Sequence, residues 1–143
     1  MFIPSSIEPE QAASLIGTGT IAFNALEKVE PNSNIAVVGT GHLAYLVTQF
    51  AKKVYKYHTT LVDYEGSEEV AKEFGADAFL KLSGETITKN TEKFNALIIT
   101  DVLKEEESKH IQDMAWRSGL VIFAIDMGFC PNVTAIDIVV CKY

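Results

Sequence analysis

The sequence predicts an α/β fold, a doubly wound parallel sheet of five to six strands with helices on both faces. Short apolar runs alternate along the chain with helical patterns, which is the order that such a sheet requires. The runs are nearly continuous in hydrophobicity, as expected of parallel strands that are covered on both faces. We expect the 143 residues to form one domain, 1–143, in which a leading helical segment (1–31) precedes the core that holds the sheet (32–143).

Each predicted strand is a short apolar run that ends at polar or turn residues. The five runs are NIAVV (34–38), TTLVD (59–63), AFLKL (78–82), ALIIT (96–100) and LVIFAI (120–125). The end of the chain, IDIVVCKY (136–143), fits either a sixth strand or a closing turn of helix. Without a sixth strand, the fifth would expose an unpaired edge, which is a liability for association.

Three helices are predicted between these strands. A stripe of apolar residues runs through 42–54. The helix over 67–74 has Ser67 as its N-cap and Gly75 as its stop. The helix over 104–117 opens with three glutamates and closes with an arginine, an order of charge that suits the helix dipole.

Two further segments have weaker patterns. The residues before the first strand indicate one or two helices that are broken near Gly17–Gly19 and end at Pro31. Residues 83–94 fit a loop or a short helix. The sequence contains no internal repeat, low-complexity tract or interdomain linker, so nothing suggests a boundary between two domains.

The composition argues against several classes of function. A net charge of −7 disfavours nucleic-acid and anionic-membrane partners, because a polyanion would be repelled. No apolar run approaches the roughly 20 residues that span a bilayer, and no cationic leader opens the chain, so a cytoplasmic protein is expected. Cys130 and Cys141 have no histidine at ligand spacing, and the three histidines are scattered. We therefore predict neither a metal site nor a catalytic nucleophile–base pair.

A glycine pattern stands between the first strand and the helix that follows it. Residues 39–44, GTGHLA, fit G-x-G-x-x-G/A. Gly39 would allow a tight turn, Gly41 would let a phosphate approach the backbone, and Ala44 would let the helix lie close to the sheet. The free N–H groups of the first helical turn, together with the helix dipole, favour a pyrophosphate. The pattern therefore predicts a dinucleotide site.

Asp63, at the end of the second predicted strand, indicates which dinucleotide binds. A carboxylate there can accept the hydroxyl hydrogens of an adenosine ribose. It would repel the 2′-phosphate of NADP(H), and residues 64–69 contain no base to compensate, so NAD(H) is predicted. Asp63 would also suit a methyltransferase that uses S-adenosylmethionine. That class tends to place an acid just ahead of its glycines, where this chain has Val37 and Val38.

His42 follows the second glycine directly and leaves two interpretations open. A protonated His42 could donate a charge-assisted hydrogen bond to the pyrophosphate. Alternatively, it is an exposed side chain of the first helical turn with no contact to a ligand. In the first case the affinity for the dinucleotide should rise as the pH falls below about 6.5.

A longer resemblance covers 12–53 and 61–77, which contain the pieces KVEP, AVVGTG, QFAKK and AKEFGAD. In these segments the chain resembles the cofactor-binding Rossmann domain of the medium-chain dehydrogenase/reductase superfamily, the alcohol dehydrogenase family. ALIITD (96–101) and SGLVIFAI (118–125) fall where the fourth and fifth strands of that family would lie. The resemblance implies NAD(P)-dependent hydride transfer, with the nicotinamide near the strand ends. It also implies a homo-oligomer, since the family pairs through the far edge of this sheet.

The resemblance also implies roles for single residues. Asp63 would hold the adenosine ribose, and Thr18 would either lie near the nicotinamide or cap a helix. The pyrophosphate would be bordered by Gly39, Gly41, Leu43 and Ala44, while Thr100 and Asp101 would lie by the ribose and Ala124 and Ile125 by the carboxamide.

The departures from the family pattern also carry expectations. The family's large substrate domain is absent from this sequence, so we expect a truncated domain that binds cofactor and is inactive alone. The cysteine ligand of the zinc-dependent members is replaced by Ser14 or Gly17, so no zinc is expected. His42 stands where the family usually has a further glycine. The alternative function is a stand-alone module that senses a nucleotide and regulates a partner.

Overall fold

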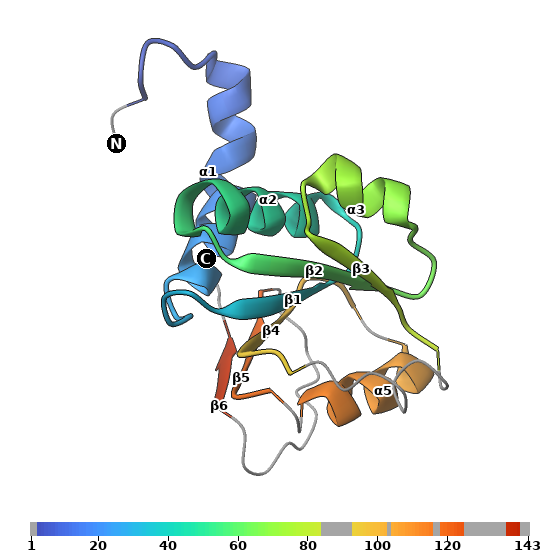
Figure 1. Cartoon of the computed structure of the whole chain (residues 1–143). Helices are drawn as coiled ribbons and strands as arrows, with labels where there is room; N and C mark the ends of the chain where they lie inside the picture. Colours follow the sequence, from blue (N-terminus) through green and yellow to red (C-terminus); the bar gives the residue numbers. More distant parts are fainter. Residues whose placement is uncertain (1–2, 84–92, 103, 116–117, 125–136, 141–143) are drawn as a thin grey trace.

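The fold consists of a central sheet between two layers of helices (Figure 1). The structure, a computed structural model, describes residues 3–83, 93–102, 104–115, 118–124 and 137–140. One face of the sheet is covered by α1 (Pro9–Leu26), α2 (His42–Phe50) and α3 (Glu68–Phe74), and the other by α5 (Glu105–Ala115). The expected fold class, a doubly wound α/β sheet, is confirmed.

The sheet has six strands, each parallel to its neighbours, in the order β3-β2-β1-β4-β5-β6. The strands are β1 (Asn34–Val38), β2 (His58–Asp63), β3 (Ala78–Lys81), β4 (Ala96–Ile99), β5 (Leu120–Phe123) and β6 (Asp137–Val140). Strands β1 to β4 agree with the predicted ranges to within one residue at each end. The strand predicted over 120–125 ends at Phe123, and Ile125 lies outside the described residues.

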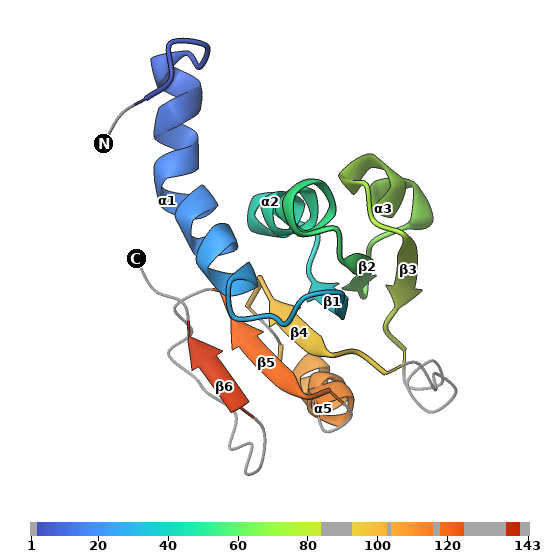
Figure 2. The same cartoon turned by 60° about the vertical axis from the view of Figure 1, so that its left-hand side comes forward.

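Strand β6 answers the question that the sequence left open about 136–143. Its residues pair with β5 from Leu120↔Asp137 to Phe123↔Val140, so the edge of β5 is covered. The backbone of residues 137–140 forms a sixth strand and not a turn of helix, and 136 and 141–143 lie outside the described residues. Figure 2 shows β6 at one end of the sheet.

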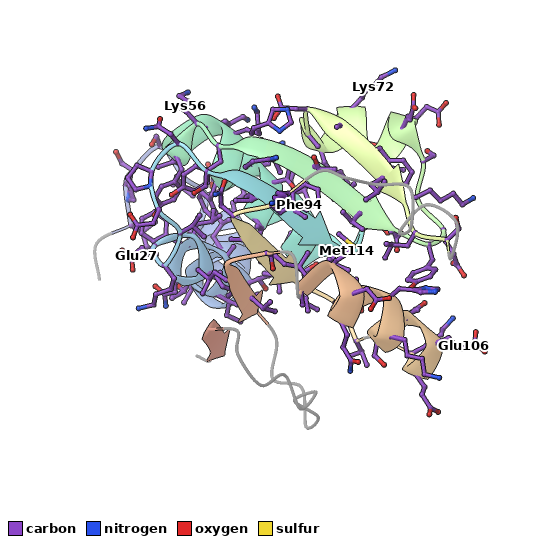
Figure 3. All side chains as sticks on the ribbon, turned by 60° about the horizontal axis from the view of Figure 1, so that its bottom comes forward. Glu27, Lys56, Lys72, Phe94, Glu106 and Met114 are labelled. Atoms are coloured by element: carbon purple, nitrogen blue, oxygen red, sulfur yellow. The ribbon has the colours of Figure 1, made fainter. Side chains whose placement is uncertain are left out.

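Both faces of the sheet are buried, and β1 shows the alternation. Ile35 and Val37 lie in the core beneath α1 and α2, whereas Ala36 and Val38 lie in the core beneath α5. Phe94 and Met114 belong to this second core (Figure 3). Burial on both faces explains why the strands are continuous apolar runs in the sequence.

Helix α2 continues directly into a π-helical turn, η1 (Ala51–Tyr55). Lys56 ends it in the left-handed conformation, with φ 60°. The Tyr57 N–H then donates to Ala51 O at 2.9 Å, which satisfies a carbonyl of the widened turn. Together α2 and η1 account for the helix predicted over 42–54.

The ends of α3 follow the predicted capping residues. The Ser67 hydroxyl accepts a hydrogen bond from the Val70 N–H at 3.4 Å, and Gly75 ends the helix with φ 82°. Helix α5 agrees with the prediction over 104–117, of which 116–117 lie outside the described residues.

The leading segment differs from the prediction. It forms one unbroken helix, α1, which passes through Gly17–Gly19 and ends at Leu26 instead of Pro31. Two helical glycines cost about 1 kcal/mol each, but packing of the buried face of α1 against α2 and the sheet outweighs that cost. The first turns of α1 extend away from the rest of the fold (Figures 1 and 2). Even this 18-residue helix lacks the apolar character of a bilayer span, as do the other described helices.

Candidate functional site

The candidate site lies where the carboxyl ends of β1, β2 and β4 meet. The connection after β1 leads to β2 on one side, whereas β4 lies on the other side of β1, so the strand order reverses at this point. In open parallel sheets, such a switch point leaves a crevice at the carboxyl ends of the strands. Gly39 and Thr100 directly follow β1 and β4, and Asp63 is the last residue of β2, so these three residues meet there.

Gly39 forms the tight turn that the sequence predicted. Its φ is +116°, a region that residues with a side chain rarely adopt. A Cβ at Gly39 would lie 2.8 Å from Thr100 Oγ1 and 3.2 Å from Asp101 Cβ. Its N–H donates to Val62 O at 2.9 Å, which ties the turn to the end of β2. The protein's own packing thus requires glycine at this position.

Gly41 has no such requirement. It is the N-cap of α2, with the ordinary φ of −81°, and a Cβ there would meet no atom within 4 Å. The first hydrogen bond of the helix runs from Tyr45 N–H to Gly41 O at 3.0 Å. The N–H groups of the preceding turn therefore have no partner within the helix. A glycine here leaves open space at the N-terminus of α2.

The remaining residues of the glycine pattern divide into buried and exposed side chains. Leu43 and Ala44 lie in the core beneath α2, so only their backbones are available to a ligand. Ala44 allows close packing, as its predicted role requires. His42 is exposed on the first turn of α2. Whether His42 contacts a phosphate stays a prediction.

Asp63 is held by a residue that the sequence analysis did not single out. Thr40 Oγ1 donates to Asp63 Oδ2 at 2.9 Å, and both side chains are half-buried. A Cβ on Gly66 would lie 3.1 Å from Thr40 Cγ2 and 3.2 Å from Asp63 Oδ2. The sequence contains only a slight signal for this contact, namely a hydroxyl residue between the two glycines. The signal is slight because the glycine pattern allows any residue at that position.

A cavity of ≈ 200 Å³ opens between these segments. It brings together Gly39, Asp63 and Asp101 of the predicted site residues. The lining also contains residues that the sequence analysis did not assign, namely Val38, Thr40, Tyr64, Glu65, Val102, Lys104 and Glu107. They come from the end of β1, the turn after it, the loop after β2, the loop after β4 and the start of α5, and no local sequence pattern could have indicated that these segments meet.

The wall of this cavity is acidic with one apolar edge. Four carboxylates line it, against the single ammonium group of Lys104. Val102 is 71% exposed, so it offers an apolar surface at the opening. Such a wall accepts hydrogen bonds from neutral hydroxyl groups and disfavours a phosphate ester.

Tyr64 closes one side of the cavity and contacts α5. Its hydroxyl lies 2.7 Å from His110 Nδ1, and the two rings stack with their centroids 5.9 Å apart. The hydroxyl also donates to Glu107 O at 3.4 Å. Burial, with the nearby charges of Glu107 and Glu106, raises the pKa of Tyr64 to about 12. The phenol is therefore neutral over the physiological range, and it lines the cavity as an uncharged group.

The other predicted site residues do not line this cavity or lie outside the described residues. Thr18 is half-buried in the middle of α1, so the interpretation of Thr18 as a helix N-cap is wrong. Thr100 is buried, and its hydroxyl donates to Val38 O at 2.7 Å. Ala124 is fully buried, and its N–H donates to Ile99 O at 2.9 Å. Ile125 falls outside the described residues, and the nicotinamide-side roles of these residues stay predictions.

Metal ligands do not gather in the described part of the chain. Among those residues, no group of three or more His, Cys, Asp or Glu side chains is placed to hold an ion. Gly17, one of the two positions aligned with the family's zinc cysteine, lies within α1.

Solved structures of alcohol dehydrogenases and reductases share this fold. A short-chain alcohol dehydrogenase of E. coli CFT073, complexed with NADH, matches with a TM-score of 0.74 and 21% identity over 99% of this chain. Acetophenone reductase of Geotrichum candidum, in complex with NAD, matches with a TM-score of 0.75 and 22% identity over 98%. A cinnamyl alcohol dehydrogenase of Sorghum bicolor matches with a TM-score of 0.72 and 19% identity over 96%.

These comparisons confirm the Rossmann fold that the resemblance implied. The chain spans less than half of the length of the three structures, 46%, 43% and 42% respectively. No family model and no curated protein matches the sequence. Because one of the structures is described as short-chain, the assignment to the medium-chain branch stays a prediction.

Proposed function

We propose that this chain is the NAD(H)-binding domain of an alcohol dehydrogenase-like oxidoreductase, of the medium-chain branch. The observation that carries the proposal is Gly41, which leaves the donors of the first turn of α2 uncovered although neither its backbone conformation nor its packing requires glycine. An anion that approaches the backbone gives this glycine a reason. The solved structures of similar fold that hold NADH or NAD support the choice of ligand.

In the proposed complex, each part of the cofactor has a matching group. The N–H groups of the first turn of α2 bind the pyrophosphate, aided by the positive end of the helix dipole. Asp63 accepts hydrogen bonds from the adenosine ribose, and the adenosine occupies the cavity between Tyr64 and Val102. The bound nicotinamide supplies the hydride acceptor or donor. The four carboxylates of the cavity favour NAD(H) over NADP(H).

The experiment that tests this function is a calorimetric titration of the chain with NADH, NADPH and S-adenosylmethionine. We expect NADH to bind most tightly. Asp63→Asn should weaken NADH by about tenfold, since it removes a charged hydrogen-bond acceptor. Preferential binding of S-adenosylmethionine, or failure of NADH to bind at all, would contradict the proposal.

We further propose that the chain alone has no substantial turnover. The described cavity offers no base for an alcohol, because Tyr64 is neutral and the carboxylates surround the ribose end. Reduction of aldehydes or quinones by the chain with NADH should therefore stay at the level of a blank without protein. Sustained turnover that depends on Asp63 would show that the chain holds its own catalytic groups.

The homo-oligomer that the resemblance implied would form through β6, which is the last strand on that side of the described sheet. Light scattering across a range of concentrations tests it. A pair of chains is expected at high concentration, and a constant monomer would contradict association through this edge.

A further inference from the structure

We infer that Thr40 is a positioning residue, which orients the Asp63 carboxylate toward the ribose and thereby sets the discrimination between NAD(H) and NADP(H). The inference rests on the proposed function. It extends that function to Thr40, a position at which the glycine pattern does not specify a residue. It comes from the hydrogen bond of 2.9 Å between Thr40 Oγ1 and Asp63 Oδ2.

A carboxylate at the end of a strand is not fixed by its own torsions. The last torsion of aspartate is broad and roughly twofold, so the two oxygens of a lone Asp63 would sample many directions. Thr40 accepts few rotamers because it is β-branched. Its hydroxyl therefore holds Oδ2 and leaves Oδ1 to accept from a ligand. Among the described residues, the Asp63 side chain makes no hydrogen bond other than the one that Thr40 donates.

The backbone beneath Thr40 is itself held in register with β2. Gly39 N–H donates to Val62 O, one residue before Asp63. The turn and the strand end are thus joined twice, by a backbone bond at Gly39 and by a side-chain bond at Thr40. This double connection fixes where the carboxylate stands relative to the first turn of α2.

Gly66 closes the arrangement from the other side. A Cβ there would stand 3.1 Å from Thr40 Cγ2 and 3.2 Å from both Cβ and Oδ2 of Asp63. Those distances are shorter than ordinary contacts, so even a methyl group would press on both partners. The loop after β2 therefore packs closely against both members of the pair.

An oriented carboxylate helps one cofactor and hinders the other. For NADH, the acceptor is already aimed at the ribose diol, so binding does not have to order it. For NADPH, the same fixed charge repels the 2′-phosphate, and it cannot swing aside. Without the Thr40 hydroxyl, Asp63 becomes free to turn away. NADH should lose affinity, and NADPH should lose less or gain.

The test is calorimetric titration of NADH and NADPH with three variants of the full 143-residue chain. Thr40→Val keeps the shape and removes the hydroxyl, and we expect the ratio of the two dissociation constants to shift toward NADPH by about tenfold. Thr40→Ser returns the hydroxyl and should restore most of the discrimination. Thr60→Val is the matched control, because the buried Thr60 hydroxyl in β2 has no hydrogen-bond partner among the described residues.

A double-mutant cycle gives the second measurement. With Asp63→Asn in place, Thr40→Val should no longer change the ratio, because no charge remains to be oriented. Gly66→Ala displaces the pair without removing either group and should move the ratio in the same direction as Thr40→Val. Gly66→Ala therefore tests the orientation of the Asp63 carboxylate if Thr40→Val does not fold.

The outcomes separate this inference from the function beneath it. If the wild-type chain binds no NADH, both the proposed function and the positioning role are wrong. If it binds NADH and discriminates against NADPH, but Thr40→Val keeps the wild-type ratio, the positioning role alone is wrong. If Thr40→Val shifts the ratio of the two dissociation constants but Thr40→Ser does not restore it, the role of the hydroxyl is likewise wrong.

Discussion

Gly39 and Thr100 face each other across the switch point of the sheet so closely that a Cβ on Gly39 would lie 2.8 Å from Thr100 Oγ1. The Thr100 hydroxyl cannot easily retreat, because it donates to Val38 O at 2.7 Å. Two residues on, Gly41 faces open space. Glycine therefore occupies positions 39 and 41 of the same pattern for different physical reasons.

The first prediction separates these reasons. Gly39→Ala should lower the free energy of unfolding by about 2 kcal/mol or more, since it combines a positive φ with a close contact. Gly41→Ala should change stability by less than about 1 kcal/mol, because its φ of −81° suits alanine. We expect Gly41→Ala nevertheless to weaken NADH by at least about tenfold, because the methyl group would occupy the place of the phosphate. Denaturant unfolding and calorimetry on both variants give the comparison.

Asp77 predicts a dependence of stability on acid. Burial acts to raise its pKa, but hydrogen bonds from Lys52 at 2.7 Å and from the Thr59 N–H at 2.7 Å outweigh burial and hold the pKa below the ordinary value of 3.8. A carboxyl whose pKa is depressed on folding adds stability above its unfolded pKa, and this stability is lost as the pH falls through the folded value. Asp77→Asn should therefore cost about 1 kcal/mol near pH 7 and progressively less as the pH falls below the ordinary value of 3.8. Asp113→Asn, on an exposed carboxylate, serves as the control for thermal unfolding at each pH.

The raised pKa of Tyr64 predicts that stability falls at high pH, the opposite of the dependence expected from Asp77. Its pKa is raised from 10.0 to about 12 in the folded protein, so the stability that this shift contributes is complete below pH 10 and is lost as the pH rises through about 12. Ultraviolet titration of the wild-type chain minus Tyr64→Phe should show one phenol that ionises near pH 12. A difference curve centred near pH 10 would mean that the contacts with His110 and α5 are not made in solution.

Thr60 predicts a gain of stability. It is 2% exposed, and its hydroxyl has no hydrogen-bond partner among the described residues. Thr60→Val should raise the free energy of unfolding by about 1 kcal/mol, because a methyl group of the same shape replaces an unpaired hydroxyl. Thr59→Val is the neighbouring control, since the Thr59 hydroxyl donates to Tyr57 O at 3.3 Å and its loss should destabilise. An equal effect of the two substitutions would contradict the difference in their hydrogen bonding.

The glycine pattern and Asp63 illustrate how much of the site a sequence can predict. Gly39, Gly41 and Ala44 belong to one strand–helix turn, so their spacing alone indicated the turn that the structure contains. Thr40 belongs to the same turn, but its partner is on β2, and no local rule states which hydroxyl will meet which carboxylate. Tyr64 and His110 are still further apart in the sequence, and only the packing of α5 beside β2 brings the Tyr64 hydroxyl to 2.7 Å from His110 Nδ1.

The leading helix illustrates the limit for the fold. Glycine lowers the local preference for helix, so the sequence suggested a break near Gly17–Gly19. The apolar face of α1 packs against α2, and this tertiary contact keeps the helix continuous to Leu26. Likewise, 136–143 fitted a strand or a helical turn equally, and pairing with β5 decided in favour of β6.

The sequence by itself determined the α/β class, the strands, the caps of α3 and the glycine turn, because these depend on periodicity and on backbone preferences of neighbouring residues. The tertiary structure alone decided the course of α1, the pairing of β6, the hold of Thr40 on Asp63 and the acidic wall of the cavity. Those features depend on contacts between residues far apart in the chain. Their energies are set by distance in space, which a single sequence does not specify.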